Sequence, residues 1–344
     1  MKHVTVYREP GVYAGWPANH GAWQWGNEFL VGFMRGQYAR TGMHNIKWPY
    51  QKVLSRSLDG GLTWTLEIPN VDFEARDTEP APEINFETDI IRVCGNYDHG
   101  GEECTRMGGF YLSSDRGRDW FGAFDFKINL KIHDWGTSRT CVIPNHNLVF
   151  LSAAHMDHWG SDWIYCAINR PTGLEFLSVV CEDDARAVMP AAVAVAGTTV
   201  VVARRRGTRR PGGWIDAFVS EDGGHKWHFA AHVADTGIHN GNPPALIEHN
   251  GVLYCAYANR SDKAVFVNTS NDLGASWHQT IILRKGECSD IGYPRLFKRT
   301  DGQLVCVYYW AQDNDDQQHI EATIFGGKLW IGQFQRVTRT SVRS

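Results

Sequence analysis

The chain repeats one short segment four times, in the pattern S-x-D-x-G-x-x-W. The copies are S-L-D-G-G-L-T-W (57–64), S-S-D-R-G-R-D-W (113–120), S-E-D-G-G-H-K-W (220–227) and S-N-D-L-G-A-S-W (270–277). In each copy the aspartate can accept hydrogen bonds from the backbone that follows it, and the glycine can adopt a positive φ, as in a β-turn. Four such turns in one chain predict a repeat architecture.

The spacing of the four aspartates predicts the number of repeat units. Successive aspartates are 56, 107 and 50 residues apart. Because the middle interval is about twice the others, a fifth copy is expected near residue 170. There, N-R-P-T-G-L-E-F (169–176) keeps a glycine and an aromatic residue but has Pro171 in the aspartate position. A period of about 50 residues with short strands is the signature of a β-propeller.

Between the turns, the chain shows pairs of strand-like runs. Residues 189–206, 242–260 and 293–310 each hold two runs of β-branched and aromatic residues around a glycine-containing turn. Residues 319–325 form a further strand, and a strand near residues 4–7 is expected to close the ring. No stretch has the periodicity of a long helix. We predict one all-β domain over residues 1–344, a six-bladed β-propeller of four-stranded antiparallel blades.

Composition narrows the possible partners and location. The chain has 34 basic and 38 acidic residues and a net charge of −4, so we expect neither nucleic acid nor a membrane as partner. The eight cysteines lack C-x-x-C spacing and several stand in apolar runs, which indicates buried free thiols and a reducing compartment. The N-terminus lacks the apolar core of a signal peptide. We expect a cytoplasmic protein, or a secreted one if a signal was removed.

The repeated turns make the chain resemble the sialidase (neuraminidase) superfamily, whose six-bladed propellers carry such segments as Asp-boxes. The resemblance covers essentially the whole chain. Asp-boxes lie on the blade periphery, so they imply the fold and leave the chemistry open. The resemblance implies an active site where the innermost strands converge on the propeller axis. Sialidases place three arginines there for the substrate carboxylate, a tyrosine nucleophile assisted by a glutamate, and an aspartate acid/base.

Five arginines are candidates for binding the substrate. By position, the resemblance assigns the first to Arg8 in Y-R-E-P and the second to Arg205 in A-R-R-R. Arg260, at the end of the corresponding strand of the next blade, is the nearest candidate for the third. Arg35, which ends L-V-G-F-M-R, and Arg295, two residues after the candidate nucleophile, are further substrate-binding candidates.

The catalytic positions show one match and two departures from the sialidase pattern. Tyr293, in D-I-G-Y-P-R-L-F, stands where the nucleophile opens the last blade; the alternative is an ordinary packed tyrosine. Met189 occupies the glutamate position and cannot transfer a proton. The segment 36–52, where the acid/base is expected, contains no acid. His44 is our candidate for that role, because imidazole titrates near neutrality; Lys47 is the other titratable group expected to replace the acid.

An insertion in the first blade is rich in aromatic residues. G-V-Y-A-G-W-P-A-N-H-G-A-W-Q-W-G-N (11–27) includes His20 and Trp25. Aromatic rings stack on sugar surfaces, so we expect a glycan-binding platform here. The alternative is a tryptophan plug that covers the seam of the ring.

A second cluster joins histidine and aspartate in I-H-D-W (132–135) and H-M-D-H (155–158). The spacing fits no standard zinc motif, and we expect no metal and no cofactor. His133 and Asp134 are instead candidates for substrate binding or for supplying the missing proton-transfer groups.

These observations leave three functions open. The first is a carbohydrate-active enzyme, a sialidase-like exo-glycosidase that releases a terminal acidic sugar from a glycan. The second is a lyase that cleaves a uronic-acid linkage by His/Tyr β-elimination, a reaction that needs no pair of carboxylic acids. The third is a propeller that binds glycans or proteins without turnover.

Overall fold

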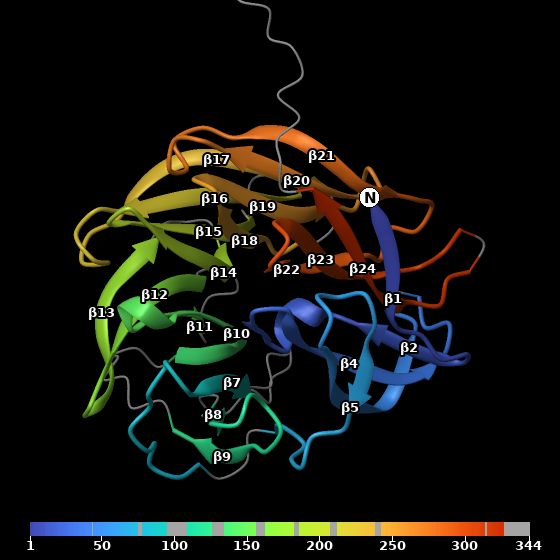
Figure 1. Ribbon diagram of the computed structural model, residues 1–344, viewed down its shortest axis with the longest axis horizontal. Coiled ribbons are helices and arrows are strands. Elements are labelled where there is room, and N and C mark those ends of the chain that lie inside the picture. The colour runs from blue at the N-terminus through green and yellow to red at the C-terminus, as the bar shows by residue number, and fades with distance from the viewer. Residues whose placement is uncertain are drawn as a thin grey trace, which may run out of the picture.

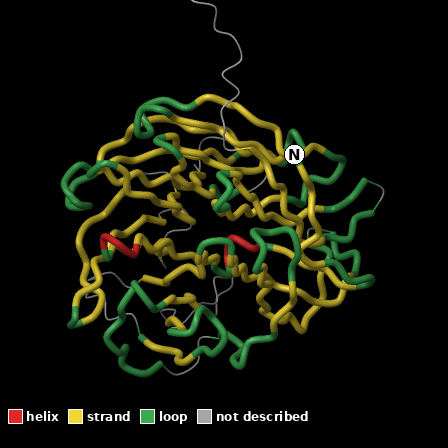
Figure 2. The backbone as a smooth tube through the Cα atoms, viewed as in Figure 1, coloured by secondary structure: helices red, strands yellow, loops and turns green. Residues whose placement is uncertain are grey.

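The structure is a computed structural model that describes residues 1–42, 44–74, 78–94, 109–125, 134–155, 162–181, 186–206, 212–237, 242–313 and 315–326. Its regular structure is almost entirely strand, as Figure 2 shows. The helices among these residues are two short 3-10 turns, η1 (Pro17–Asn19) and η2 (Pro144–His146). No helix within these ranges is long and apolar enough to cross a membrane.

The strands form six sheets arranged around a common centre (Figure 1), which confirms the predicted six-bladed propeller. The strands of blade one are β2 (Val12–Gly15), β3 (Ala22–Trp25), β4 (Glu28–Tyr38), β5 (Ile46–Ser57) and β6 (Thr65–Glu67). Those described in blade two are β7 (Ile90–Cys94), β8 (Gly109–Ser113) and β9 (Phe121–Phe124). Those of blade three are β10 (Asp134–Ile143), β11 (Leu148–His155), β12 (Asp162–Arg170) and β13 (Gly173–Cys181).

The remaining three blades each contain four antiparallel strands. Blade four has β14 (Arg186–Val195), β15 (Thr198–Arg206), β16 (Gly213–Ser220) and β17 (His228–Gly237). Blade five has β18 (Ala245–His249), β19 (Val252–Asn259), β20 (Ala264–Ser270) and β21 (His278–Lys285). Blade six has β22 (Gly292–Lys298), β23 (Gln303–Trp310), β24 (His319–Gly326) and β1 (Lys2–Tyr7).

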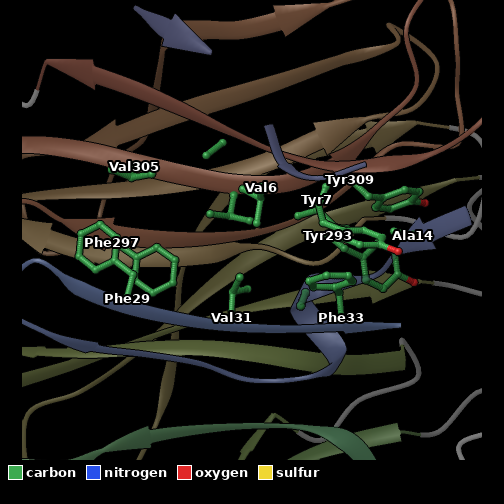
Figure 3. Close-up of a cluster of buried hydrophobic side chains, with 14 of the residues drawn as sticks. Val6, Tyr7, Ala14, Phe29, Val31, Phe33, Tyr293, Phe297, Val305 and Tyr309 are labelled. Carbon is green, nitrogen blue, oxygen red and sulfur yellow. The ribbon is translucent and has the colours of Figure 1, made fainter. Parts of the chain in front are cut away.

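The N-terminal strand closes the ring as predicted. β1 pairs with β24, so the first strand of the chain is the outer strand of the last blade. This pairing joins the N-terminal strand to the last blade and so closes the ring. The largest buried cluster lies beside this closure and contains Val6, Phe29, Val31 and Val305 (Figure 3).

The four repeated turns share one hydrogen-bonding pattern. In the first, Asp59 Oδ1 accepts hydrogen bonds from the amides of Leu62 and Thr63, both at 2.9 Å. The Ser57 hydroxyl accepts from the Gly61 amide at 2.8 Å, and Trp64 Nε1 donates to the Gly61 carbonyl at 3.1 Å. The other three turns repeat the serine and tryptophan bonds.

The glycine of each turn also brings the turn against the preceding blade. Gly61 has φ +86°, and a Cβ there would lie 3.2 Å from Val305 of blade six. The same construction puts Gly117 against Leu30 of blade one and Gly274 against Val200 of blade four. The glycine is therefore required both by its backbone conformation and by close packing between blades.

The degenerate fifth copy folds differently from the other four. Pro171 and Thr172 form the turn between β12 and β13, and Gly173 keeps a positive φ of 116°. Phe176, which stands in the tryptophan position, is 44% exposed and does not act as a plug. No aspartate is present here to accept hydrogen bonds from the amides that follow. The turn is therefore a short hairpin, and the Phe176 side chain remains exposed.

The cysteines whose side chains the structure describes are free thiols, as predicted. Among those residues the free cysteines are Cys141, Cys166, Cys181, Cys255, Cys288 and Cys306. Burial raises the pKa of the Cys166 thiol to about 12, which makes a reactive thiolate unfavourable at neutral pH.

The first repeated turn makes a testable contribution to stability. Burial alone would raise the pKa of Asp59, but hydrogen bonds from Thr63 and Ser57 lower it to about 2. The stabilisation is therefore present above the unfolded-state pKa near ~4 and is lost as the pH falls towards 2. Asp59→Asn should lower the free energy of unfolding by about 1 kcal/mol at pH 7, the site being partly exposed.

Urea denaturation at pH 7 and near pH 2 tests this contribution. The loss should be much smaller at the lower pH. Asp119→Asn is the control, because no side-chain hydrogen bond of the Asp119 carboxylate is found within the described ranges. An equal loss for both variants, or a loss that persists in acid, would contradict the assignment.

Candidate functional site

Tyr293 opens the innermost strand of blade six and is held in an unusual backbone conformation. Its φ is 54°, and the register between β22 and β23 shifts just after it, between Gly292 and Arg295. The Tyr293 amide donates to Asn242 Oδ1 at 2.7 Å. A bulge of this kind re-aims a side chain, and here the Tyr293 ring lies beside Tyr309 with centroids 5.9 Å apart (Figure 3).

Met189 occupies the equivalent position in blade four. Its φ is 57°, a proline follows it as in Tyr293, and the register of β14 against β15 shifts at the same point. Met189 and Tyr293 belong to one buried cluster. The position that the resemblance assigns to a glutamate therefore lies in the same cluster as the tyrosine, and it carries a thioether in place of a carboxylate.

Asp290 is the carboxylate that lies at this site. Its Oδ1 accepts hydrogen bonds from Tyr309 Oη at 2.6 Å and from Arg260 Nη2 at 3.2 Å. Its Oδ2 lies 3.2 Å from His44 Nδ1 and 3.4 Å from Tyr13 Oη. The side chain is 15% exposed. Four groups from blades one, five and six thus converge on one carboxylate.

The electrostatics of this cluster follow from its burial. Burial alone would raise the pKa of Asp290, but the hydrogen bond with His44 and the charge of Arg260 lower it below its usual value. Burial and the Asp290 charge raise the pKa of Tyr309 well above its usual range. At neutral pH the cluster is therefore an ionised carboxylate with donors around it.

His44 lies at the open side of the cluster. It stands in the loop between β4 and β5, and its side chain is 36% exposed. Its ring meets Trp16 edge-on with centroids 5.0 Å apart. Because Nδ1 faces the Asp290 carboxylate, the neutral ring carries its proton on Nδ1 and leaves Nε2 as the accepting nitrogen. His44 thus has the arrangement of a histidine oriented by a carboxylate.

Four of the five candidate arginines lie close to a carboxylate. Arg8 bonds Asp315 at 2.8 Å, Arg35 lies 3.6 Å from Glu9, and Arg260 bonds Asp290. Of these three, Arg260 alone belongs to the cluster that contains His44 and also lies over the Tyr293 ring, 5.9 Å from its centroid. These three candidate arginines therefore lie at different places in the structure and do not form one binding site.

Arg205 is buried within the packing between blades. Its Nη1 lies 2.6 Å from Cys181 Sγ, its Nε is 4.0 Å from Asp216, and its side chain is 2% exposed. These contacts place it in a buried layer formed by blades three and four.

Arg295 differs from the other four. Its Nη2 donates to the carbonyl of Ala18 at 2.5 Å, and its buried Nε has no hydrogen-bond partner. Within the part of the chain that the structure describes, no carboxylate lies within 4 Å of it. Burial lowers the pKa of Arg295 to about 10, which still leaves it charged at neutral pH. It is therefore a cation available to an anion.

The insertion of blade one is part of the propeller core and is not a free loop. β2 and β3 both pair with β4, so they form one innermost strand that is interrupted by residues 16–21. Within the interruption, η1 contacts strands β4, β10, β22 and β23 of three blades. His20 is buried, and burial together with the charges of Arg92 and Lys52 lowers its pKa well below the usual value.

The tryptophans of this insertion divide between two places. Trp25 lies beside Arg116 of the second repeated turn, with the guanidinium 5.7 Å from its ring. Trp23 packs on Trp120 of the same turn. These two lie between blades one and two, away from the closure at blade six, whereas Trp16 packs against His44 and Tyr13.

The second cluster is only partly covered by the structure. His133 lies outside the described residues, and only the backbone of Asp134, at the start of β10, is described. Over the described ranges, no group of three His, Cys, Asp or Glu side chains is arranged to hold a metal ion.

A cavity of about 1020 Å³ opens beside the cluster, between blades one and two. Trp16 and His20 of the insertion line one side of it, and Arg92 and Tyr111 of blade two line another. Trp16 lines this cavity and its ring also packs on the His44 ring, so Trp16 lies between the cavity and the cluster.

Comparison with known proteins places the chain in a family. The model of the BNR repeat-like domain matches residues 90–306, more than half of the chain. The chain belongs to the BNR repeat-like family. No curated protein matches the sequence.

Several solved structures share the fold of this BNR repeat-like protein. A Dyadobacter fermentans protein of unknown function aligns with a TM-score of 0.71 at 17% identity, over 94% of this chain and 97% of its own. The Penicillium chrysogenum α-L-arabinanase, complexed with arabinobiose, gives 0.62 at 12% identity over 95% and 98%. Trypanosoma rangeli sialidase, in complex with sialic acid, gives 0.59 at 11% identity over 88% and 53%. At these identities the likeness shows the fold.

Three residues of the cluster were missed by the sequence reasoning on this BNR repeat-like protein. Asp290 precedes the candidate nucleophile by three residues, Tyr309 is the penultimate residue of β23, and Tyr13 lies in the first-blade insertion. A carboxylate just before an innermost strand could have been noticed, because the start of that strand was already expected at the axis.

Proposed function

We propose that this BNR repeat-like protein is a carbohydrate-active enzyme that cleaves a glycan carrying a carboxylate, with His44 as the proton-transfer group. The observation that carries the proposal is the pair of His44 and Asp290. The Asp290 carboxylate faces Nδ1 and orients the imidazole, and the other ring nitrogen is left for the substrate. The pair stands at the strand ends where propellers build their sites, beside Tyr293.

Two kinds of observation support an acidic glycan as the substrate. Solved structures of the same fold include proteins described as an arabinanase and a sialidase, both with sugars bound. In this chain, Arg295 is a half-buried cation whose Nε has no hydrogen-bond partner, and η1 connects it to the site, since Ala18 accepts from Arg295 while Trp16 packs on His44. A substrate carboxylate would form a charge-assisted pair with Arg295.

In the hydrolytic reaction, the enzyme would act as a sialidase-like exo-glycosidase on a terminal acidic sugar. His44 protonates the leaving oxygen as a general acid, and Tyr293 attacks or stabilises the anomeric centre in place of a carboxylate nucleophile.

A second reaction, β-elimination at a uronic acid, is favoured by the state of Asp290. Glycosidases normally use two carboxyl groups, one of them a proton donor, whereas Asp290 is ionised and engaged by four donors. In the elimination, Arg295 neutralises the uronate carboxylate and His44 Nε2 removes the proton from the adjacent carbon. The electron pair forms a carbon–carbon double bond, the glycosidic carbon–oxygen bond breaks, and Tyr293 protonates the leaving oxygen.

One measurement separates these reactions. The purified chain is incubated with sialosides, uronides and neutral aryl glycosides, and the products are weighed by mass spectrometry. Hydrolysis adds one water to the products and elimination adds none, while elimination alone produces a chromophore in the near ultraviolet. We expect turnover on an acidic substrate. Binding without any product would contradict the proposed enzyme and favour a glycan-binding propeller.

A further inference from the structure

Exposed aromatic and apolar side chains gather at the cavity between blades one and two. Within the described ranges, eleven large hydrophobic side chains are exposed, and Trp48, Tyr50 and Ile68 line this one cavity. Trp48 is 80% exposed and Tyr50 47% exposed. Single exposed apolar residues need no explanation, but a group of them around one cavity marks a binding surface.

The backbone of blade one directs these rings outward. β4 pairs with β5 at Arg35↔Gln51 and again at Gln37↔Lys47. The single residue Gly36 therefore stands opposite the three residues Trp48, Pro49 and Tyr50. A bulge that adds residues to one strand turns their side chains away from the regular sheet. The projection of the two rings thus follows from the register of the sheet.

The cavity floor supplies polar groups beside the rings. Lys52 Nζ bonds Glu74 at 2.8 Å and the carbonyl of Phe73 at 2.9 Å. Arg92 lies over the Phe73 ring, 3.7 Å from its centroid. Aromatic rings flanked by fixed charged donors and acceptors suit sugars, which have apolar C–H faces and a rim of hydroxyl groups.

We propose that the Trp48–Pro49–Tyr50 bulge is a stacking platform for further units of the glycan, so that the enzyme takes an acidic oligosaccharide of several units. This inference rests on the proposed function, because it extends the substrate from the site at His44. The cavity of about 1020 Å³ is at the upper limit of pockets that enclose a drug-sized ligand. Trp16 borders this cavity and packs on His44, so the proposed chain would extend from the site past Trp16.

Binding measured without turnover tests the platform. His44→Ala is titrated by calorimetry with oligogalacturonates of one, two and four units. We expect affinity to rise at least about tenfold from one unit to four, and Trp48→Ala in the same background to remove most of that rise. Tyr50→Ala should act in the same direction. Phe229→Ala is the matched control, because Phe229 is an aromatic side chain, 58% exposed, on blade four.

The outcomes separate the platform from the enzyme. Affinity independent of length, no binding of the tetramer, or equal losses for Trp48→Ala and Phe229→Ala would each overturn the platform. If the chain still turned over small acidic glycosides, those results would leave the proposed enzyme intact. Length-dependent, Trp48-dependent binding without turnover by the unmutated chain would instead support the platform and contradict the proposed enzyme.

Discussion

His44→Ala is expected to lower kcat by about 10²–10⁴-fold on any substrate that the chain turns over, because a positioned general acid or base contributes about that factor. The imidazole is half-exposed in a loop, so its removal leaves the core packing in place. KM should change much less than kcat, since the effect lies on proton transfer. Steady-state kinetics on the substrate identified by product mass gives both values.

The chain contains a matched control for this variant. His232 lies 3.4 Å from Asp216 and is 45% exposed, so it is also a histidine beside an aspartate, but on the outer strand of blade four. His232→Ala should keep full activity. Equal losses in the two variants would mean that the effect comes from general destabilisation, and unchanged activity in His44→Ala would refute its catalytic role.

Asp290→Ala is expected to lower the free energy of unfolding by about 3–5 kcal/mol at neutral pH. Removing one partner of a buried ion pair leaves the other charge without compensation, here Arg260, and it also leaves the buried Tyr309 hydroxyl without that acceptor. Activity should fall as well, because His44 loses the group that orients it. Chemical denaturation followed by fluorescence measures the loss of stability.

The pH dependence of this loss has a defined sign. The pKa of Asp290 is lower in the folded state than in the unfolded chain. Its stabilisation is therefore complete above the unfolded-state pKa of about 4 and disappears as the pH falls through the folded-state value. The difference between the unmutated chain and Asp290→Ala should narrow below about pH 4.

A second acid on the same face provides the comparison. Asp316 pairs with Arg40 at an exposed position, with side chains 43% and 80% exposed. Exposed ion pairs contribute little to the free energy of unfolding. Asp316→Ala should therefore lower that free energy much less than Asp290→Ala does. If Asp290→Ala were no more destabilising than Asp316→Ala, the central role of Asp290 in the cluster would be wrong.

Much of the architecture was predictable because it depends on local rules repeated along the chain. The turn segments carry their own hydrogen-bond acceptors and glycines, so their spacing alone indicated the blades and the closing strand. The resemblance placed Tyr293 and Met189 at the starts of innermost strands; in the structure Tyr293 is the second residue of β22 and Met189 the fourth of β14. Local sequence could not show that the Phe176 side chain remains exposed, because its burial depends on packing against the neighbouring blade.

The sequence by itself thus determined the propeller, the number of its blades and the absence of a glutamate at Met189. Only the tertiary structure decided which charged groups meet. Asp290, Arg260, Tyr309, Tyr13 and His44 come from three blades, and their convergence depends on how the ring closes. The same holds for the arginines, which look alike in sequence. Arg8, Arg35 and Arg205 lie beside carboxylates of their own, and among the described residues Arg295 faces none. Pairing is set by distances between strands that are far apart in the chain.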